Sequence, residues 1–284
     1  MSLPVLGAAH AASPSDLVRY FHKCARTFAS HYAEQHELDC GTALFAPALP
    51  DIRDANRVFD ATVPPGTSAA DAVAEAEAFY GSHKLTCHKW IPNPAAPAES
   101  VLPLIEHLTR DRGFVRTSDD VMHLAGAPPS PVAMAADLTI IPARASYKHA
   151  RQVLEEAASG WQSTELVDAA LSHLDDPHYD ALLALKDGRA VAHVGVLAVG
   201  ELGLIEDVFV SAGHRRQGVA RTMLARAVEL CARSQFKHVL LSVAPDNAAA
   251  TALYARFGFR KIGEFVQYVA PATVEAERVA RATP

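Results

Sequence analysis

The residues best suited to chemistry lie at 214–220, which read HRRQGVA between an apolar strand pattern and an amphipathic helix pattern. Free backbone N–H groups and the dipole at a helix N-terminus both favour a negative charge. Gly218 and the small Ala220 let a bulky phosphate approach the backbone. Charge-assisted hydrogen bonds can come from Arg215, Arg216 and Arg221. The pattern predicts a phosphate-binding loop, and a solvated basic helix cap is the alternative.

Two further polar features flank this loop. Upstream, the strand pattern at 205–210 reads IEDVFV, and in a regular strand Glu206 and Val208 share one face while Asp207 points to the other. Downstream, one helix and one strand later, residues 247–259 carry Asn247, Ala250, Tyr254, Gly258 and Phe259. The three features therefore follow one another in the order strand, loop, helix, strand and helix.

In this order the motifs resemble those of the GNAT superfamily of acyl-coenzyme A-dependent N-acyltransferases. The family motif Arg/Gln-x-x-Gly-x-Gly/Ala is matched by residues 215–220. The motif Asn-x-x-Ala-x-x-x-Tyr with a following Gly-Phe pair is matched by residues 247–259. The resemblance covers residues 137–270 and implies an acyltransferase, of the kind classed under EC 2.3.1, that uses acetyl-CoA.

The resemblance also implies the coenzyme contacts. Backbone groups of Val208, Phe209 and Val210 are expected to bind the pantetheine arm and to direct an amide at the thioester oxygen. Amides from 216 to 221 are expected to hold the pyrophosphate, and Asn247 to contact the coenzyme near a splayed strand end. The expected coenzyme-binding set is Val208, Phe209, Val210, Arg215, Arg216, Gln217, Gly218, Val219, Ala220, Arg221 and Asn247.

Acetyl transfer to an amine needs two proton movements. The amine must lose a proton to attack, and the departing thiolate leaves more easily when it receives one. Glu206 is the candidate base, with simple ion pairing to a nearby cation as the alternative. Tyr254 is the candidate acid, with a purely structural ring as the alternative. A backbone amide offsets the charge on the tetrahedral oxygen, so neither a serine nor a cysteine nucleophile is required.

The elements that must position these residues follow from apolar periodicity. The second half is expected to contain a strand at 137–143, two helices between 146 and 176, a run of strands at 179–210, a helix at 218–234, a strand at 238–245, a helix from 247 that ends in Gly258 and a last strand at 259–269. The first half is expected to begin with a helix capped by Ser13 or Ser15 and to continue as alternating strands and helices. The fold class is α/β (α+β).

The ends of the two halves resemble each other. Residues 108–124 match residues 253–269 at a constant offset, with identities at Leu108/Leu253, Gly113/Gly258, Phe114/Phe259 and Val121/Val266. The pattern predicts two tandem GNAT-like domains, each a mixed, mostly antiparallel sheet flanked by helices, at 1–128 and 137–284 with a Pro/Ala-rich linker at 129–136.

The first domain is expected to be degenerate. The position of Tyr254 corresponds to Thr109, which cannot serve as the same acid. The loop before its helix, VPPGTSAADA, has one glycine and no arginine, so it lacks the donors for a pyrophosphate. This half is expected to serve packing or to form a wall of the substrate site. Trp161 is a further candidate for that wall, with a core position as the alternative.

Composition excludes several classes of function. The net charge of −6 argues against a general nucleic-acid surface. No apolar run reaches the length of about 18 residues that a membrane span needs. The four cysteines form no CxxC pair and no His/Cys spacing suggests a metal site, so a cytoplasmic protein without a metal is expected.

The sequence therefore predicts an N-acetyltransferase that moves an acetyl group from acetyl-CoA to a primary amine by direct transfer in a ternary complex. The acceptor is expected to be a small-molecule amine, with a peptide amine as the alternative. Two other functions remain open: an acyl-CoA-binding regulatory module without turnover, and an enzyme for another acyl-CoA. The identity of the acceptor, the choice between a monomer and a homodimer, and whether Glu206 acts directly or through water are also open.

Overall fold

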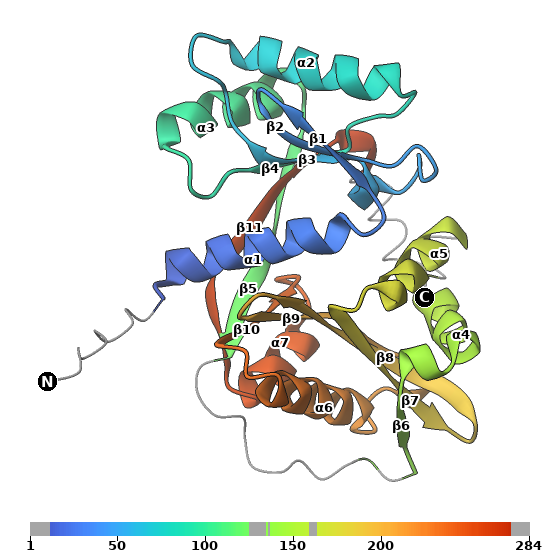
Figure 1. Ribbon diagram of the computed structural model, residues 1–284. Coiled ribbons are helices and arrows are strands. Elements are labelled where there is room, and N and C mark those ends of the chain that lie inside the picture. The colour runs from blue at the N-terminus through green and yellow to red at the C-terminus, as the bar shows by residue number, and fades with distance from the viewer. Residues whose placement is uncertain (1–11, 125–134, 136, 159–163, 274–284) are drawn as a thin grey trace, which may run out of the picture.

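The computed structural model describes residues 12–124, 135, 137–158 and 164–273. Within these ranges the chain forms helices around one continuous mixed sheet, in the order β1-β2-β3-β4-β11-β5-β10-β9-β8-β7-β6 (Figure 1). The expected mixed α/β fold is confirmed. The expected linker at 129–136, apart from residue 135, and the candidate Trp161 lie outside the described residues.

The first half is described from Ala12 to Leu124. Its elements are α1 (Pro14–Ala29), β1 (Glu34–Leu38), β2 (Gly41–Phe45), the short turn η1 (Arg53–Ala55), β3 (Arg57–Ala61), α2 (Ala69–Ser82), β4 (Lys89–Pro92), α3 (Ala98–Glu106) and β5 (Val115–Leu124). Ser13 caps α1 and Ser68 caps α2. Strand β1 was not expected because its residues are mostly exposed, so they carry no apolar alternation.

The second half carries the same types of element. They are β6 (Thr139–Pro142), α4 (Tyr147–Ala157), α5 (Thr164–Ser172), β7 (Tyr179–Lys186), β8 (Arg189–Val199), β9 (Leu202–Val210), α6 (Val219–Arg233), β10 (His238–Val243), α7 (Ala248–Arg256) and β11 (Phe259–Val269). In both halves a run of antiparallel strands, three in the first and four in the second, leads through a helix to a parallel strand and then through another helix to a last strand. This repeated order supports an internal duplication.

The two halves exchange their last strands. β5 of the first half lies between β10 and β11, and β11 of the second half lies between β4 and β5. In the long antiparallel β5–β11 pair, Asp119 faces Phe265 and Asp120 faces Glu264. At the offset between the halves Asp119 corresponds to Glu264 and Asp120 to Phe265, so each aspartate faces the residue equivalent to the other, as an approximate twofold axis requires. The expected two sheets are joined into one.

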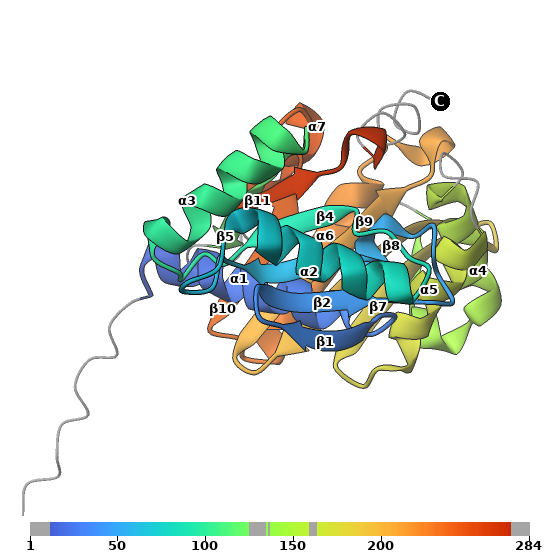
Figure 2. The ribbon, with the colours of Figure 1, turned by 90° about the horizontal axis from the view of Figure 1, so that it is seen from above.

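The helices cover the two faces of this sheet. The inner face is the one that packs against α1, α4 and α5, in a core that includes Phe21, Phe59, Val153, Leu204 and Phe265. The outer face packs against α6 and α7 in the second half and against α2 and α3 in the first. Seen from above, α4 and α5 lie together on one side of the molecule and α3 on the opposite side (Figure 2).

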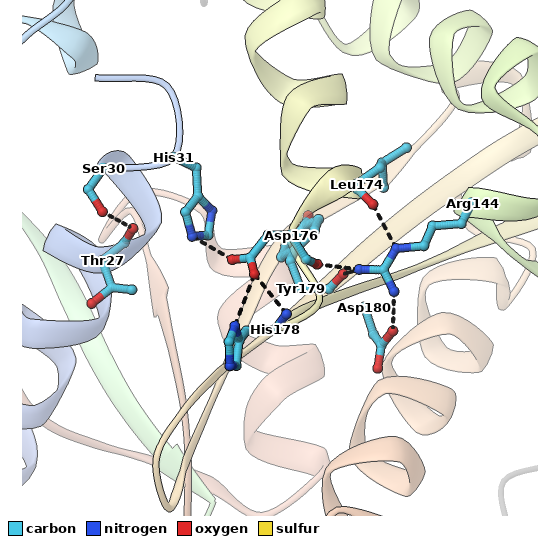
Figure 3. A network of polar contacts seen from close by, with 9 residues as sticks. All are labelled: Thr27, Ser30, His31, Arg144, Leu174, Asp176, His178, Tyr179 and Asp180. Atoms are coloured by element: carbon cyan, nitrogen blue, oxygen red, sulfur yellow. Dashed lines mark hydrogen bonds and ion pairs between the residues drawn. The ribbon is translucent and has the colours of Figure 1, made fainter. Parts of the chain in front are cut away.

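Polar contacts join the end of α1 to the second half (Figure 3). His31 Nε2 lies 2.6 Å from the Asp176 carboxylate, just before β7. Arg144 binds the same segment from the other side, because its Nε donates to the Leu174 carbonyl at 2.7 Å and its Nη2 to the Tyr179 carbonyl at 2.6 Å. These bonds fix the segment that begins β7 and with it the position of Tyr179.

Phe265 tests the joint between the halves. Its ring packs against Phe21 and Phe59 of the first half, at centroid distances of 5.3 and 6.3 Å, although it belongs to the last strand of the second. Phe265→Ala is expected to lower the free energy of unfolding by about 3–5 kcal/mol because it leaves a cavity in a buried cluster. Urea denaturation followed by circular dichroism measures the change.

The control is Leu102→Ala, whose side chain is 59% exposed and where a change within about 0.5 kcal/mol is expected. An equally small effect of Phe265→Ala would contradict this description of the joint.

Candidate functional site

The loop between β9 and α6 leaves a helix N-terminus without a side-chain cap. Gly218 is the N-cap of α6 with φ +81°, a left-handed conformation that glycine adopts without strain. No side chain of the described residues caps the first turn, so its backbone N–H groups lack the partner that a capping side chain would supply. The loop thus presents the donors that an anion needs.

Two of the polar side chains of the loop hold its shape. Arg215 Nε donates to the Val210 carbonyl at 3.1 Å, and Gln217 Nε2 donates to the Gly213 carbonyl at 2.9 Å. Arg215 also lines the pocket beside the loop, whereas Gln217 is absent from the lining residues. The side chain of Gln217 therefore shapes the loop, and the binding role expected for this residue stays a prediction.

A pocket of about 740 Å³ opens beside this helix N-terminus. Its size lies in the range of small-molecule and cofactor sites. It gathers ten of the eleven expected coenzyme-binding residues with the candidate acid: Val208, Phe209, Val210, Arg215, Arg216, Gly218, Val219, Ala220, Arg221, Asn247 and Tyr254. Sequence reasoning missed the rest of the lining, which comes from one face of α7: Ala249, Ala250, Ala252, Leu253 and Arg256. The run of alanines in this helix was the available signal, since small residues leave room for a ligand.

The strands beside the pocket separate. β9 and β10 pair in parallel only from Leu202/His238 to Leu204/Leu240, and β9 then runs on to Val210. Beyond Leu204 the edge of β9 that faces β10 has no strand partner among the described residues. Such an open edge can bind an extended ligand through backbone hydrogen bonds.

A β-bulge at Asp207 corrects the expected facing of β9. Asp207 has φ +54°, and the β8–β9 register shifts between His193 and Gly195. Two residues of β9 therefore oppose one of β8, and the alternation of side chains is interrupted. Val208 packs on the outer face, so the prediction that it shares a face with Glu206 was wrong.

The bulge also turns Asp207 toward the inner face, beside Glu206. Tyr179, a member of the inner core, donates a 3.0 Å hydrogen bond from its hydroxyl to Asp207 Oδ2. Gly195 makes room for this hydroxyl, since a Cβ at Gly195 would lie 2.0 Å from it. Asp207 and Tyr179 were not among the expected site residues, and the sequence holds no local signal for the bulge.

The environment of Glu206 favours the protonated form. Burial, and then the neighbouring charges of Asp207 and Asp119, raise the pKa of Glu206 from 4.5 to about 8, against an opposing effect of Arg57. A carboxyl with such a pKa exchanges protons near neutral pH, which suits a general base. Asp119 and Arg57 belong to the first half, so this half contributes to the electrostatics of the site.

Tyr254 lies at the opposite side of the sheet. It is a buried member of the outer core and lines the pocket, and burial raises the pKa of its phenol to about 12, with a smaller effect from the Glu206 charge. A phenol that stays protonated can donate a proton at neutral pH. Asn247 positions its helix, because its side chain accepts a hydrogen bond from the Ala250 N–H at 3.1 Å as the N-cap of α7.

The first half keeps the scaffold of this site but not its donors. Asp60 has φ +55° at a register shift of β3, which parallels Asp207. However, β3 and β4 still pair at Ala61/Pro92, so the strands do not separate as β9 and β10 do. The N-terminus of α2 is occupied by its own Ser68, whose hydroxyl accepts from the Asp71 N–H. Thr109 donates to the Ile105 carbonyl within its own helix.

No three His, Cys, Asp or Glu side chains of the described ranges lie together in a way that could hold a metal ion. None of the helices described is long and apolar enough to cross a membrane.

Comparison with known proteins agrees with this geometry. Residues 147–259 match the model of the acetyltransferase (GNAT) family. A candidate [ribosomal protein bS18]-alanine N-acetyltransferase from Bacillus subtilis is 29% identical over 112 residues, which are 39% of this chain and 74% of that protein. N-acetyltransferase 8 from Homo sapiens is 28% identical over 107 residues, which are 36% of this chain and 47% of that protein.

Solved structures extend the likeness of fold to both halves. A GCN5-related N-acetyltransferase from Kribbella flavida has a TM-score of 0.61 at 17% identity, over 90% of this chain and 96% of that one. A tandem GNAT protein from the clavulanic acid biosynthesis pathway has a TM-score of 0.51 at 18% identity, over 71% of this chain and 69% of that one. The tandem arrangement is therefore a known architecture.

Glu206 gives the site a pH-dependent signature. The folded state keeps the Glu206 proton up to about pH 8, whereas the unfolded state releases it near pH 4.5, so wild-type stability falls as the pH rises between these values. Glu206→Gln binds no proton and should stabilise the protein increasingly over this window, by more than about 2 kcal/mol at pH 9 relative to pH 5.

Urea denaturation of both proteins at pH 5 and pH 9 measures this difference. Exposed Glu229→Gln is the control and should show no such trend. A pH-independent difference between Glu206→Gln and wild type would mean that Glu206 ionises normally.

Proposed function

Because residues 147–259 form an acetyltransferase domain of the GNAT family, we propose that the protein transfers an acetyl group from acetyl-CoA directly to a primary amine. The pocket beside α6 carries this proposal, because it combines an uncapped helix N-terminus, an open strand edge and a buried phenol. These three features are the ones that a pyrophosphate, a pantetheine arm and a leaving thiolate require.

The chain's own groups divide the binding among them. The N–H groups around Gly218 and the start of α6 bind the pyrophosphate, and Arg216 and Arg221 add charge to the same pocket. The open edge at Val208–Val210 accepts the pantetheine arm as an added strand would bind. Asn247 fixes the N-terminus of α7 and so the position of Tyr254.

The transfer then needs two proton movements on opposite faces of the sheet. Glu206, in its ionised form, takes the proton that the amine loses as its nitrogen bonds to the acetyl carbon. Tyr254 gives its proton to the sulfur as the carbon–sulfur bond breaks. A backbone N–H of the open β9 edge offsets the charge on the thioester oxygen.

The same proposal assigns different work to the two halves. The domain at 137–284 binds the coenzyme, and the domain at 1–128, joined by the linker at 129–136, is degenerate and forms part of the acceptor side. The self-capped α2 and the paired β3 and β4 support this assignment, since both remove a feature that the coenzyme needs.

Calorimetric titration with acetyl-CoA tests the binding part of this proposal. One site per chain is expected, and Gly218→Val should abolish it by forcing a branched side chain into the left-handed N-cap. The matched control is Gly66→Val in the equivalent loop of the first half, where φ is +80° and no atom would contact the new Cβ. Two sites per chain would refute a degenerate first domain, and no site would refute the function.

Tyr254→Phe tests the acid. Removal of the hydroxyl should lower kcat by about 10²-fold or more, because a general acid contributes that much, and should leave the Kd of acetyl-CoA unchanged. Turnover is measured as CoA release with an accepted amine, and Kd by calorimetry. Tyr268→Phe, in a buried tyrosine outside the pocket, is the control that should keep full turnover. If Tyr254→Phe turns over normally, Tyr254 is not the acid.

A further inference from the structure

Short-range hydrogen bonds fold the loop 211–218, which joins β9 to α6. The His214 N–H donates to the Ser211 carbonyl at 2.8 Å. Arg215 Nε donates at 3.1 Å to the carbonyl of Val210, the last residue of β9. These bonds give the loop its local shape, but they do not join it to any helix of the inner face.

Two positions of this loop have a left-handed backbone. Arg216 has φ +62° and Gly218 has φ +81°. Glycine adopts this conformation freely, whereas an arginine adopts it only where the surrounding structure fixes it. The N–H groups that the proposed function directs at the pyrophosphate belong to the same segment. The loop therefore needs a contact from outside to keep these groups in place before the coenzyme binds.

Glu156, in the last turn of α4, supplies such a contact. Its Oε2 accepts a 2.7 Å hydrogen bond from the Ser211 hydroxyl, and its Oε1 accepts the Ala212 N–H at 3.2 Å. Ser211 is 5% exposed, and its own N–H donates to the Val191 carbonyl of β8 at 2.9 Å. One carboxylate thus holds a side chain and a backbone group at the point where β9 ends and the loop begins.

Glu156 reaches this point from the opposite layer of the fold. Val153 and Leu154 of α4 belong to the inner core, whereas the pocket lies beside α6 and α7 on the outer face. Glu156 is not among the residues that line the pocket. A carboxylate would also repel a phosphate at close range. Any effect of Glu156 on the coenzyme therefore passes through Ser211 and Ala212.

We propose that Glu156 is a positioning residue for the coenzyme: its carboxylate fixes Ser211 and Ala212 and so keeps the loop 211–218 in the conformation that receives the pyrophosphate. The inference rests on the proposed binding of acetyl-CoA. Without Glu156, part of the binding free energy goes into ordering the loop, so the affinity falls although every group that contacts the coenzyme is retained. A helix of the inner face, where Glu206 lies, thereby controls the affinity for the acetyl donor.

Calorimetric titration with acetyl-CoA compares Glu156→Ala with the wild type. The variant lacks both bonds, so its Kd should rise by at least about 10-fold, as the loss of two hydrogen bonds to a charged group implies. Glu155→Ala is the matched control, because Glu155 is the preceding, exposed residue of the same helix, and it should keep the wild-type Kd. Thermal denaturation of each variant without coenzyme shows whether it is folded.

Glu156→Gln separates the geometry of the contact from its charge. The amide oxygen can accept the Ala212 N–H, and the amide nitrogen can donate to the Ser211 hydroxyl, which then acts as the acceptor. This variant should return the Kd close to that of the wild type. If Glu156→Ala does not fold, Ser211→Ala removes one of the two bonds and should give a smaller rise in Kd.

Hydrogen exchange measures the loop itself. The N–H groups of His214 and Arg215 donate to carbonyls within the loop and do not contact Glu156. In Glu156→Ala without coenzyme they should exchange faster than in the wild type, because the loop opens more often. Saturation with acetyl-CoA should remove this difference.

The outcomes separate this inference from the proposed function. Wild-type protein that does not bind acetyl-CoA refutes the proposed function. If the wild type binds, an unchanged Kd in folded Glu156→Ala, an equal rise in Glu155→Ala, or a Kd of Glu156→Gln as high as that of Glu156→Ala overturns the positioning role. Unchanged exchange at His214 and Arg215 in Glu156→Ala also overturns it.

Discussion

The rest of the structure depends on the pairing of β5 with β11. Each strand ends its own half of the chain, yet each lies in the sheet between strands of both halves. Ten residues of β5 pair with residues of β11, so the strands of the two halves belong to one continuous sheet. The inner core continues across this joint, from Phe21 and Phe59 through Phe265 to Leu204. A fixed relation between the halves is what allows residues of the first to act on Glu206.

The two halves share a scaffold but differ in what caps the N-terminus of the helix that follows the antiparallel strands. Both have a positive φ at an aspartate in the last strand of their antiparallel run, β3 or β9, and both follow it with a helix. The first half satisfies the helix N-terminus with a serine hydroxyl, whereas the second leaves it to a glycine without a side chain. One residue at the N-cap thus separates a helix that needs nothing further from one that can receive an anion.

Sequence patterns predicted the elements well where periodicity was strong. The helices at 69–82 and 219–233, the loop with Gly218 and the helix of Tyr254 all follow from apolar spacing and from two motifs. The sequence patterns did not predict β1, because its side chains are mostly exposed. They also did not predict the bulge at Asp207, which changes the direction of side chains without any change in residue type. The exchange of β5 and β11 was out of reach, because strand order depends on contacts far apart in the chain.

The residues of the first half that act on Glu206 could not be predicted from the sequence either. Arg57 and Asp119 stand far from Glu206 in the sequence, and each has the appearance of an ordinary strand residue. Only the order of the strands in the sheet brings their charges close enough to act on Glu206. The pocket motif is local and could be found from spacing, whereas the charges that act on Glu206 come from both halves.

The position of β11 also has a consequence for synthesis on the ribosome. β4 pairs on one side with β3 and on the other with β11, which is translated about 170 residues later. Until Phe259–Val269 has emerged from the ribosome, one edge of β4 and one edge of β5 have no strand partner. These two strands carry Trp90, Ile91 and Val121, which are buried in the folded protein. Open apolar edges of this kind invite pairing with other chains. The nascent first half therefore exposes the strand edges that β11 covers in the folded protein.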